Sequence, residues 1–149
     1  MLSERAGSEV WRRFLGVKLG LMSEDAGFRE LVGTELASAE AGRAVVSVRA
    51  EERHLNPNGT IHGGVVYTLV DVSMAEALKT MIEGDERPVT IEIKINYLEP
   101  GRPGTLTSTA RVRKGGKRLV IVEAEVAQEN EDDSEIVALA TGTYTRVDG

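Results

Sequence analysis

The sequence predicts an α+β fold in which an antiparallel β-sheet wraps around one long central helix. The first observation is the segment from Val65 to Ile82, which lacks Pro and Gly and is apolar around nearly its whole circumference. Such a segment predicts a buried helix. The second observation is that four segments after it alternate apolar and polar residues, and the third is that two strand-like segments precede it. One helix with six such strands is typical of a sheet packed on a helix.

Three elements are expected before the central helix. Residues 8–22 predict an extra N-terminal amphipathic helix, because apolar side chains recur at helical spacing at Val10, Phe14, Val17 and Leu21. Strands are expected at Leu31–Ala39 and Ala44–Ala50, joined by a turn over residues 40–43. Residues 54–60 read His-Leu-Asn-Pro-Asn-Gly-Thr and predict a loop, because Pro and Gly interrupt both regular structures.

The central helix is expected to begin near His62 and Gly63 and to be closed by Gly84. Four strands are expected after it, at Val89–Tyr97, Thr105–Arg113, Lys117–Gln128 and Ile136–Val147. The hairpin around Gly115 and Gly116 needs an odd loop length to keep the apolar residues of both its strands on one face, and a three-residue turn with a glycine bulge provides it. The acidic run over residues 129–135 is expected to be a solvated hairpin loop.

The composition predicts a single compact soluble domain. The chain has 149 residues, 41% of them hydrophobic and 28% charged, so one domain covering residues 1–149 is expected. The absence of cysteine excludes disulfides, thiolate nucleophiles and Cys-ligated zinc. No apolar run approaches the ~18 residues that a membrane span needs, and a net charge of −6 works against general nucleic-acid binding. We therefore expect a cytoplasmic protein without nucleic acid, membrane, metal or cofactor.

Asp71 is a carboxylate in the apolar helix with no cation beside it. Its neighbours at three and four positions are Tyr67, Thr68, Met74 and Ala75. Glu76, by contrast, has Lys79 at i+3, and we expect these two to form an ordinary surface pair. Burying an unpaired carboxylate is costly, so Asp71 is either paired from elsewhere in the fold or kept for function. Both interpretations stay open on this pattern alone.

The run Ile61-His62-Gly63-Gly64 stands at the start of the same helix. The first helical turn has unpaired N–H groups at the positive end of the helix dipole, and glycine lets a ligand approach that backbone closely. This is the physical basis of an oxyanion hole. A structural interpretation is also open, in which the two glycines only shape a tight turn into a crowded helix.

The spacing of these two groups predicts a dimer. Gly63 and Asp71 are eight residues apart, which corresponds to ~12 Å along a helix. One reacting carbonyl can hardly be held by the Gly63 N–H and attacked by Asp71, or by its water, across that distance. If both groups serve one reaction, they come from two chains whose helices pack antiparallel across a two-fold axis.

The segment from Asn56 to Asp71, read as Asn-Pro-Asn-Gly-Thr-Ile-His-Gly-Gly-Val-Val-Tyr-Thr-Leu-Val-Asp, resembles the PaaI-like hotdog-fold acyl-CoA thioesterases. The resemblance extends through Val89-Thr90-Ile91 and Asn96–Pro100 and covers roughly residues 28–147. It implies a hotdog fold and hydrolysis of an acyl-CoA substrate at a subunit interface. It also implies a cytoplasmic homodimer or a dimer of dimers, that is a homotetramer, and an association with phenylacetate degradation.

The resemblance assigns roles to five positions. Asp71 is implied to be the nucleophile or general base, and the Gly63 N–H to polarise the thioester carbonyl. Asn56 and His62 are implied to orient water or the thioester, and Thr90 to position water. Thr90 has a second interpretation, because strand parity places it with Glu92 and Lys94 on the polar face. The His62 side chain has one too, in which it merely holds the loop.

A basic hairpin is the candidate site for the phosphates of CoA. Five cations gather around its glycines in an otherwise acidic chain: Arg111, Arg113, Lys114, Lys117 and Arg118. Point charges and backbone N–H groups there are suited to the 3′-phosphate and pyrophosphate. The alternative is that the cations serve only solubility.

Two alternative functions share the predicted fold. A hotdog enoyl-CoA hydratase or dehydratase would resemble proteins with Asp-x-Asn-Pro-x-His in one loop, but this chain has His54 and Gly59 at the two acid–base positions. A non-catalytic acyl-CoA-binding protein would not need the carboxylate of Asp71. Serine-hydrolase and nucleotide-binding alternatives lack their motifs, since no G-x-S-x-G, P-loop or G-x-G-x-x-G run occurs.

Overall fold

A computed structural model describes residues 27–130 and 133–148. The chain divides into two compact units, residues 1–31 and 32–149. The helix predicted over residues 8–22 lies outside the described residues. A short helix, α2 (Phe28–Val32), stands where the first strand was predicted to begin, and that strand starts only at Thr34. The reason is Gly33, whose φ of 80° ends the helix in a left-handed conformation before the strand.

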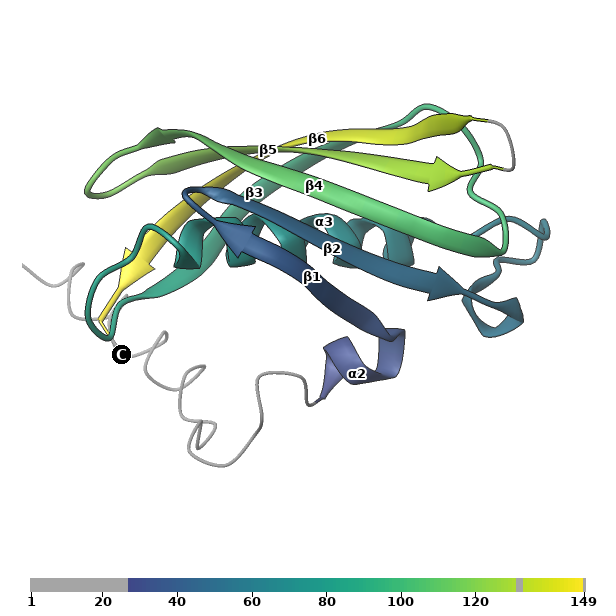
Figure 1. The fold of residues 1–149 in the computed structure, drawn as a ribbon, viewed down its shortest axis with the longest axis horizontal. Coiled ribbons are helices and arrows are strands. Elements are labelled where there is room, and N and C mark those ends of the chain that lie inside the picture. The colour runs from purple at the N-terminus through teal and green to yellow at the C-terminus, as the bar shows by residue number, and fades with distance from the viewer. Residues whose placement is uncertain (1–26, 131–132, 149) are drawn as a thin grey trace, which may run out of the picture. The chain divides into compact units, whose positions relative to one another are not determined.

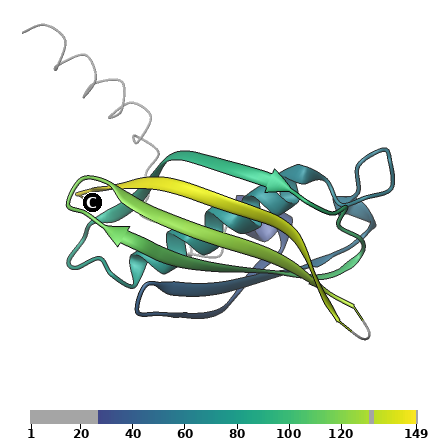
Figure 2. The same cartoon turned by 90° about the horizontal axis from the view of Figure 1, so that it is seen from above.

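The second unit is a six-stranded antiparallel sheet around the long helix α3, which covers Gly63–Lys79. Figures 1 and 2 show α3 lying against one face of the sheet. The strand order is β1-β2-β4-β5-β6-β3, so β1 and β3 form the two edges. The strands are β1 (Thr34–Glu40), β2 (Arg43–Ala50), β3 (Arg87–Tyr97), β4 (Gly104–Gly115), β5 (Val120–Glu129) and β6 (Ser134–Val147).

Helix α3 is buried on most of its circumference, as its apolar composition predicts. It packs against all six strands, and Leu69, Val70 and Met74 are fully buried. The helix ends at Lys79, three residues before the predicted Ile82. Thr80 explains the earlier end, because its hydroxyl donates to the Ala77 carbonyl and accepts from the Gly42 N–H of the β1–β2 turn. This pair of hydrogen bonds fixes the end of the helix to the sheet.

The inner face of the sheet carries small and branched apolar side chains. On β2 the buried residues are Ala44, Val46, Val48 and Ala50, which confirms the predicted alternation. On β4, Ala110 and Leu106 lie directly opposite Ala44 and Val48, and the buried face continues on β5 with Val122, Ala124 and Val126. A buried hydroxyl pair joins helix and sheet here, with 2.7 Å between the Ser73 and Ser108 oxygens. The described residues include no helix with the length and apolar character to cross a membrane.

Two β-bulges change the side-chain parity expected from the sequence. In β4 the register shifts between Val112 and Lys114, so Arg113 is the additional residue. This bulge, rather than a three-residue turn, keeps Val112 facing Val122, and the connecting loop is residues 116–119.

In β3 the register shifts between Thr90 and Glu92. Thr90 therefore pairs with Tyr144 and shares the inner face with Ile93 and Ile95, which corrects the prediction that it lies with Glu92 and Lys94.

Gly142 on β6 packs against the side chain of Met74 from α3. A Cβ atom built there would lie 2.6 Å from the Met74 Sδ and 2.9 Å from the Tyr144 Cε2. Both of these side chains are fully buried and have little room to move. The position therefore requires glycine for space rather than for backbone freedom.

We expect Gly142→Ala to lower the free energy of unfolding by ~1–3 kcal/mol, because the added methyl overpacks the contact between α3 and β6. Urea unfolding followed by circular dichroism measures this change. Gly115→Ala is the matched control, since the nearest atom to its Cβ would be the Met81 Cε at 3.7 Å. Equal stability of the two variants would contradict the close packing described at Gly142.

Candidate functional site

Asp71 lies on α3 where the helix passes under β3 and β6. Its Oδ1 atom accepts two hydrogen bonds of 2.8 Å, one from the Thr90 hydroxyl and one from the Tyr144 hydroxyl. Within the described part of the chain, no other side chain donates to this carboxylate and no ion pair includes it. The sequence showed no cation on the same helix, and the fold supplies two neutral hydroxyls instead. Asp71 is thus a half-buried carboxylate oriented by hydroxyls and not neutralised by a cation.

Tyr144 was not among the predicted site residues. It is fully buried on the inner face of β6. Burial and, after it, the nearby negative charge of Asp71 raise the pKa of the Tyr144 phenol well above its usual value. The phenol therefore keeps its proton and acts as a hydrogen-bond donor to the carboxylate. From the sequence, Tyr144 was only one of the alternating residues of the last strand.

Thr90 contacts Asp71 although its side chain is exposed. The bulge at Ile91 turns it to the inner face of the sheet, so Thr90 does not share the polar face with Glu92 and Lys94. Its catalytic role stays a prediction.

The start of α3 presents one backbone N–H without an intramolecular acceptor. The His62 ring caps the helix, because its Nδ1 accepts from the Gly64 N–H at 2.9 Å. The neighbouring Gly63 N–H has no hydrogen-bond acceptor among the described residues. Such an N–H in the first turn of a helix is available to a ligand. The His62 side chain therefore has a structural partner at the start of the helix, and its role in orienting water or the thioester stays a prediction.

Tyr97 holds the other side of Gly63. Its hydroxyl donates to the Gly63 carbonyl at 2.9 Å, and a Cβ at Gly63 would lie 3.3 Å from the Tyr97 Cζ. Burial, with a smaller contribution from Tyr67, raises the pKa of the Tyr97 phenol. A side chain at position 63 would lie tightly against this ring, and Tyr97 would have to shift by a few tenths of an ångström to accommodate it.

An open groove of about 480 Å³ runs beside Gly63. It is lined by the residues before the helix, by the end of β3 and by the loop that follows β3, including Asn56, Gly63, Val66, Tyr97, Leu98 and Val137. Gly63, which lines the groove, lies eight residues before Asp71 on the same helix, as the sequence indicated. One chain therefore presents the two groups separately.

The Asn56 side chain is engaged within its own loop. Its Oδ1 accepts from the N–H groups of Asn58 and Thr60, and its Nδ2 donates to the Thr60 hydroxyl. This arrangement fixes the turn that precedes the helix. Asn56 lies at the groove with Gly63, as predicted, but its amide already has partners in the loop.

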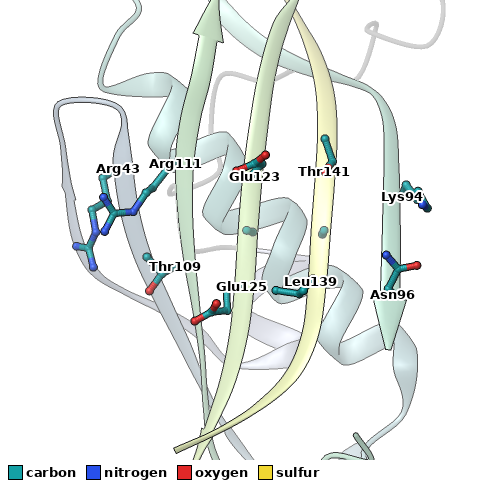
Figure 3. A pocket seen from close by; sticks show the side chains of 11 residues that line it. Arg43, Lys94, Asn96, Thr109, Arg111, Glu123, Glu125, Leu139 and Thr141 are labelled. Atoms are coloured by element: carbon teal, nitrogen blue, oxygen red, sulfur yellow. The ribbon is translucent and has the colours of Figure 1, made fainter. Parts of the chain in front are cut away.

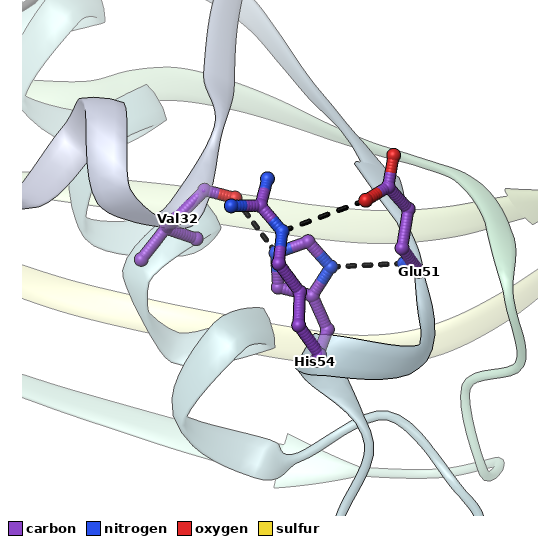
Figure 4. A network of polar contacts seen from close by, with 4 residues as sticks. Val32, Glu51 and His54 are labelled. Carbon is purple, nitrogen blue, oxygen red and sulfur yellow. Dashed lines mark hydrogen bonds and ion pairs between the residues drawn. The ribbon is translucent and has the colours of Figure 1, made fainter.

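Two buried polar side chains that the sequence analysis did not assign make hydrogen bonds to backbone atoms of other segments. Gln128 makes two hydrogen bonds to the backbone of Arg102, one to its N–H and one from its own amide to the carbonyl. His54 bridges Glu51 and Val32, as Figure 4 shows, with its Nδ1 accepting from the Glu51 N–H and its Nε2 bonded to the Val32 carbonyl. Because an N–H only donates and a carbonyl only accepts, the ring hydrogen is on Nε2. A contact with another segment, as Gln128 and His54 make, has no local sequence signal.

Glu76 differs from the prediction of a surface pair. Its carboxylate accepts from Lys79 at 2.9 Å, as expected, but the side chain of Glu76 is only 8% exposed. The rest of the fold buries Glu76, whereas Lys79 stays exposed. The i+3 pair is therefore only partly in solvent. Asp71 is the less buried of the two carboxylates on α3.

The cations predicted to bind CoA phosphates lie around the β4–β5 hairpin. Arg113 pairs with Glu123 at 3.0 Å, and Arg111 lies opposite Arg43 on the neighbouring strand. Figure 3 shows Arg43 and Arg111 at one side of a groove of about 750 Å³ on the outer face of the sheet, with Glu123 and Glu125 beside them. Lys114, Lys117 and Arg118 are exposed at the hairpin tip. The structure thus groups the five cations, and phosphate binding stays a prediction.

Comparisons with known proteins point to one family. Residues 58–135 match the sequence profile of the thioesterase superfamily. The chain is 30% identical over 129 residues to acyl-coenzyme A thioesterase PaaI of Escherichia coli, covering 86% of this chain and 88% of that protein. It is 33% identical over 105 residues to the 1,4-dihydroxy-2-naphthoyl-CoA hydrolase of Listeria monocytogenes, covering 70% and 85%. A mutant of the phenylacetic acid degradation protein PaaI from Thermus thermophilus superimposes with a TM-score of 0.72 at 30% identity, covering 80% of this chain and 98% of that chain.

Proposed function

The chain belongs to the thioesterase superfamily and has the hotdog fold, and from this premise we propose that it hydrolyses acyl-CoA thioesters to the free acid and CoA. The observation that carries the proposal is the carboxylate of Asp71, which hydroxyls orient and no described cation neutralises. A protein that only bound acyl-CoA would have no use for such a group. Relatives that share 30–33% of their residues are named CoA-thioester hydrolases, which supports the proposal.

The proposed reaction uses two groups on the thioester carbonyl. The free N–H of Gly63 donates to the carbonyl oxygen and stabilises the negative charge that develops there. Asp71 either attacks the carbonyl carbon, forming an anhydride that water then opens, or removes a proton from the attacking water. In both routes the C–S bond breaks, the acyl carbon gains a water oxygen, and the CoA sulfur leaves as a thiolate that takes up a proton.

We propose that each reaction centre is shared by two chains. Within one α3 helix, Gly63 and Asp71 are ~12 Å apart along the axis, too far for one carbonyl. The outer edge of β3 supports a dimer, because β3 ends the sheet and exposes Ile91 and Tyr97. Near its two ends, β3 contacts Asp71 through Thr90 and Gly63 through Tyr97. Antiparallel pairing of two β3 strands would bring the Gly63 end of one chain to the Asp71 end of the other.

The groove beside Gly63 is the proposed channel for the thioester end of the substrate. The five cations of the β4–β5 hairpin are the proposed contacts for the CoA phosphates. In a chain with a net charge of −6, such a local cluster is the feature that would attract a polyanionic nucleotide. The ion pair with Glu123 orients Arg113 on this surface.

We expect Asp71→Asn to lower kcat by ~10²–10⁴-fold, because the amide neither attacks nor accepts a proton. The assay is thiol release from phenylacetyl-CoA, isobutyryl-CoA and octanoyl-CoA, with circular dichroism and gel filtration to follow fold and dimer. Asp85→Asn, at an exposed loop position, is the matched control and should leave turnover unchanged. Wild-type turnover by Asp71→Asn would remove this residue from the mechanism.

We expect complementation between two inactive variants. Gly63→Pro removes the proposed donor, and the His62 ψ of 132° suits a residue before proline. Mixed with Asp71→Asn and refolded together, half of the dimers would be hybrids with one intact site, restoring about a quarter of wild-type activity. The same mixture without refolding is the control. If Gly63 and Asp71 of one chain served one site, every hybrid site would be defective and no activity would return.

We expect Arg111→Ala combined with Arg113→Ala to raise KM for acyl-CoA by roughly tenfold, because two phosphate contacts are lost. The KM for the N-acetylcysteamine thioester of the same acid, which lacks the nucleotide, should stay unchanged. Arg49→Ala removes an exposed guanidinium from the other end of the same sheet face and serves as the control. Equal effects on both substrates would argue against phosphate binding at the hairpin.

A further inference from the structure

Tyr144 has a hydrogen-bond geometry that the core packing does not require. Its hydroxyl lies 3.3 Å from the Asp71 carbonyl oxygen, and this bond alone would satisfy a buried phenol. The same hydroxyl lies closer, at 2.8 Å, to the Asp71 Oδ1. The stronger contact of this buried group is therefore with the carboxylate.

A second hydroxyl reaches the same oxygen from another strand. Thr90 on β3 donates to Oδ1 at 2.8 Å, so donors from β3 and β6 converge on one atom of the carboxylate. Two hydrogen bonds to Oδ1 fix both the rotation and the direction of the carboxyl plane. Oδ2 receives no hydrogen bond from any residue in the described part of the chain. The arrangement distinguishes the two oxygens of one side chain.

We propose that Tyr144 is a positioning residue of the active site, which with Thr90 holds Oδ1 of Asp71 so that Oδ2 is the atom directed at the reacting thioester or its water. The inference rests on the proposed function, because it assigns a task to a group that acts only through Asp71. It adds a residue from the last strand to a site otherwise built from α3 and β3. It also names which oxygen reacts.

Tyr144→Phe tests the proposal, because it keeps the ring beside Gly142 and removes only the hydroxyl. We expect kcat for the best substrate of the acyl-CoA panel to fall by roughly tenfold, with KM changed less than about twofold. Thr90→Val, at an exposed position, removes the other donor to the same oxygen and should likewise lower kcat more than it changes KM.

Ser108→Ala is the matched control. It removes a buried hydroxyl that bonds to α3 through Ser73, but this pair is remote from the carboxylate in the hydrogen-bond network. Its kcat and KM should match those of the wild type. If Tyr144→Phe and Thr90→Val also kept the wild-type kcat while Asp71→Asn was inactive, the positioning role would be refuted and the proposed function would stand. Full activity of Asp71→Asn would overturn the proposed function and this inference with it.

Discussion

The burial of α3 against the inner face of the sheet is the constraint on which the other features depend. The helix is apolar around most of its surface, and every strand contacts it. The sheet accommodates it with small side chains on its inner face and, opposite Met74, with Gly142. Both ends are fixed by hydrogen bonds, through His62 at the start and Thr80 at the end. Close packing of this kind leaves the helix little freedom to slide or rotate.

This fixed helix is what makes a defined site possible. Because α3 cannot rotate, Asp71 is held toward the β3 and β6 side of the sheet, where Thr90 and Tyr144 reach its carboxylate. The same rigidity holds Gly63, the first residue of the helix, at the groove and beside Tyr97. Reactive groups on a packed helix keep their geometry more closely than groups on loops do. The chemistry proposed for this chain thus relies on its core as much as on the residues that touch substrate.

The sequence predicted the parts of this structure that repeat with a regular period. The central helix, the six strands and the apolar face of β2 follow from patterns of 3.6 and 2 residues. Asp71 and Gly63 could be singled out because each breaks a local expectation, one as a charge among apolar residues and one as a glycine at the start of a helix. The resemblance of the segment from Asn56 to Asp71 to one family then supplied the fold.

Features created by pairing between distant segments could not be predicted in the same way. The bulges at Ile91 and Arg113 have no glycine to mark them, yet each reverses the face of the residues that follow. In the sequence, Tyr144 is one of the alternating residues of the last strand. Its contact with Asp71 exists only because the fold places β6 over that part of α3. Gln128 and His54 are polar residues whose partners lie far along the chain. Glu76 was misjudged because burial of its side of α3 depends on the rest of the fold.

The hydrogen bonds between Gln128 and the backbone of residue 102 have a consequence for which residues this position can accept. Both hydrogen bonds of Gln128 are to main-chain atoms of Arg102, its N–H and its carbonyl, and neither is to the guanidinium. Residue 102 can therefore vary in size and charge while the anchor of its loop persists.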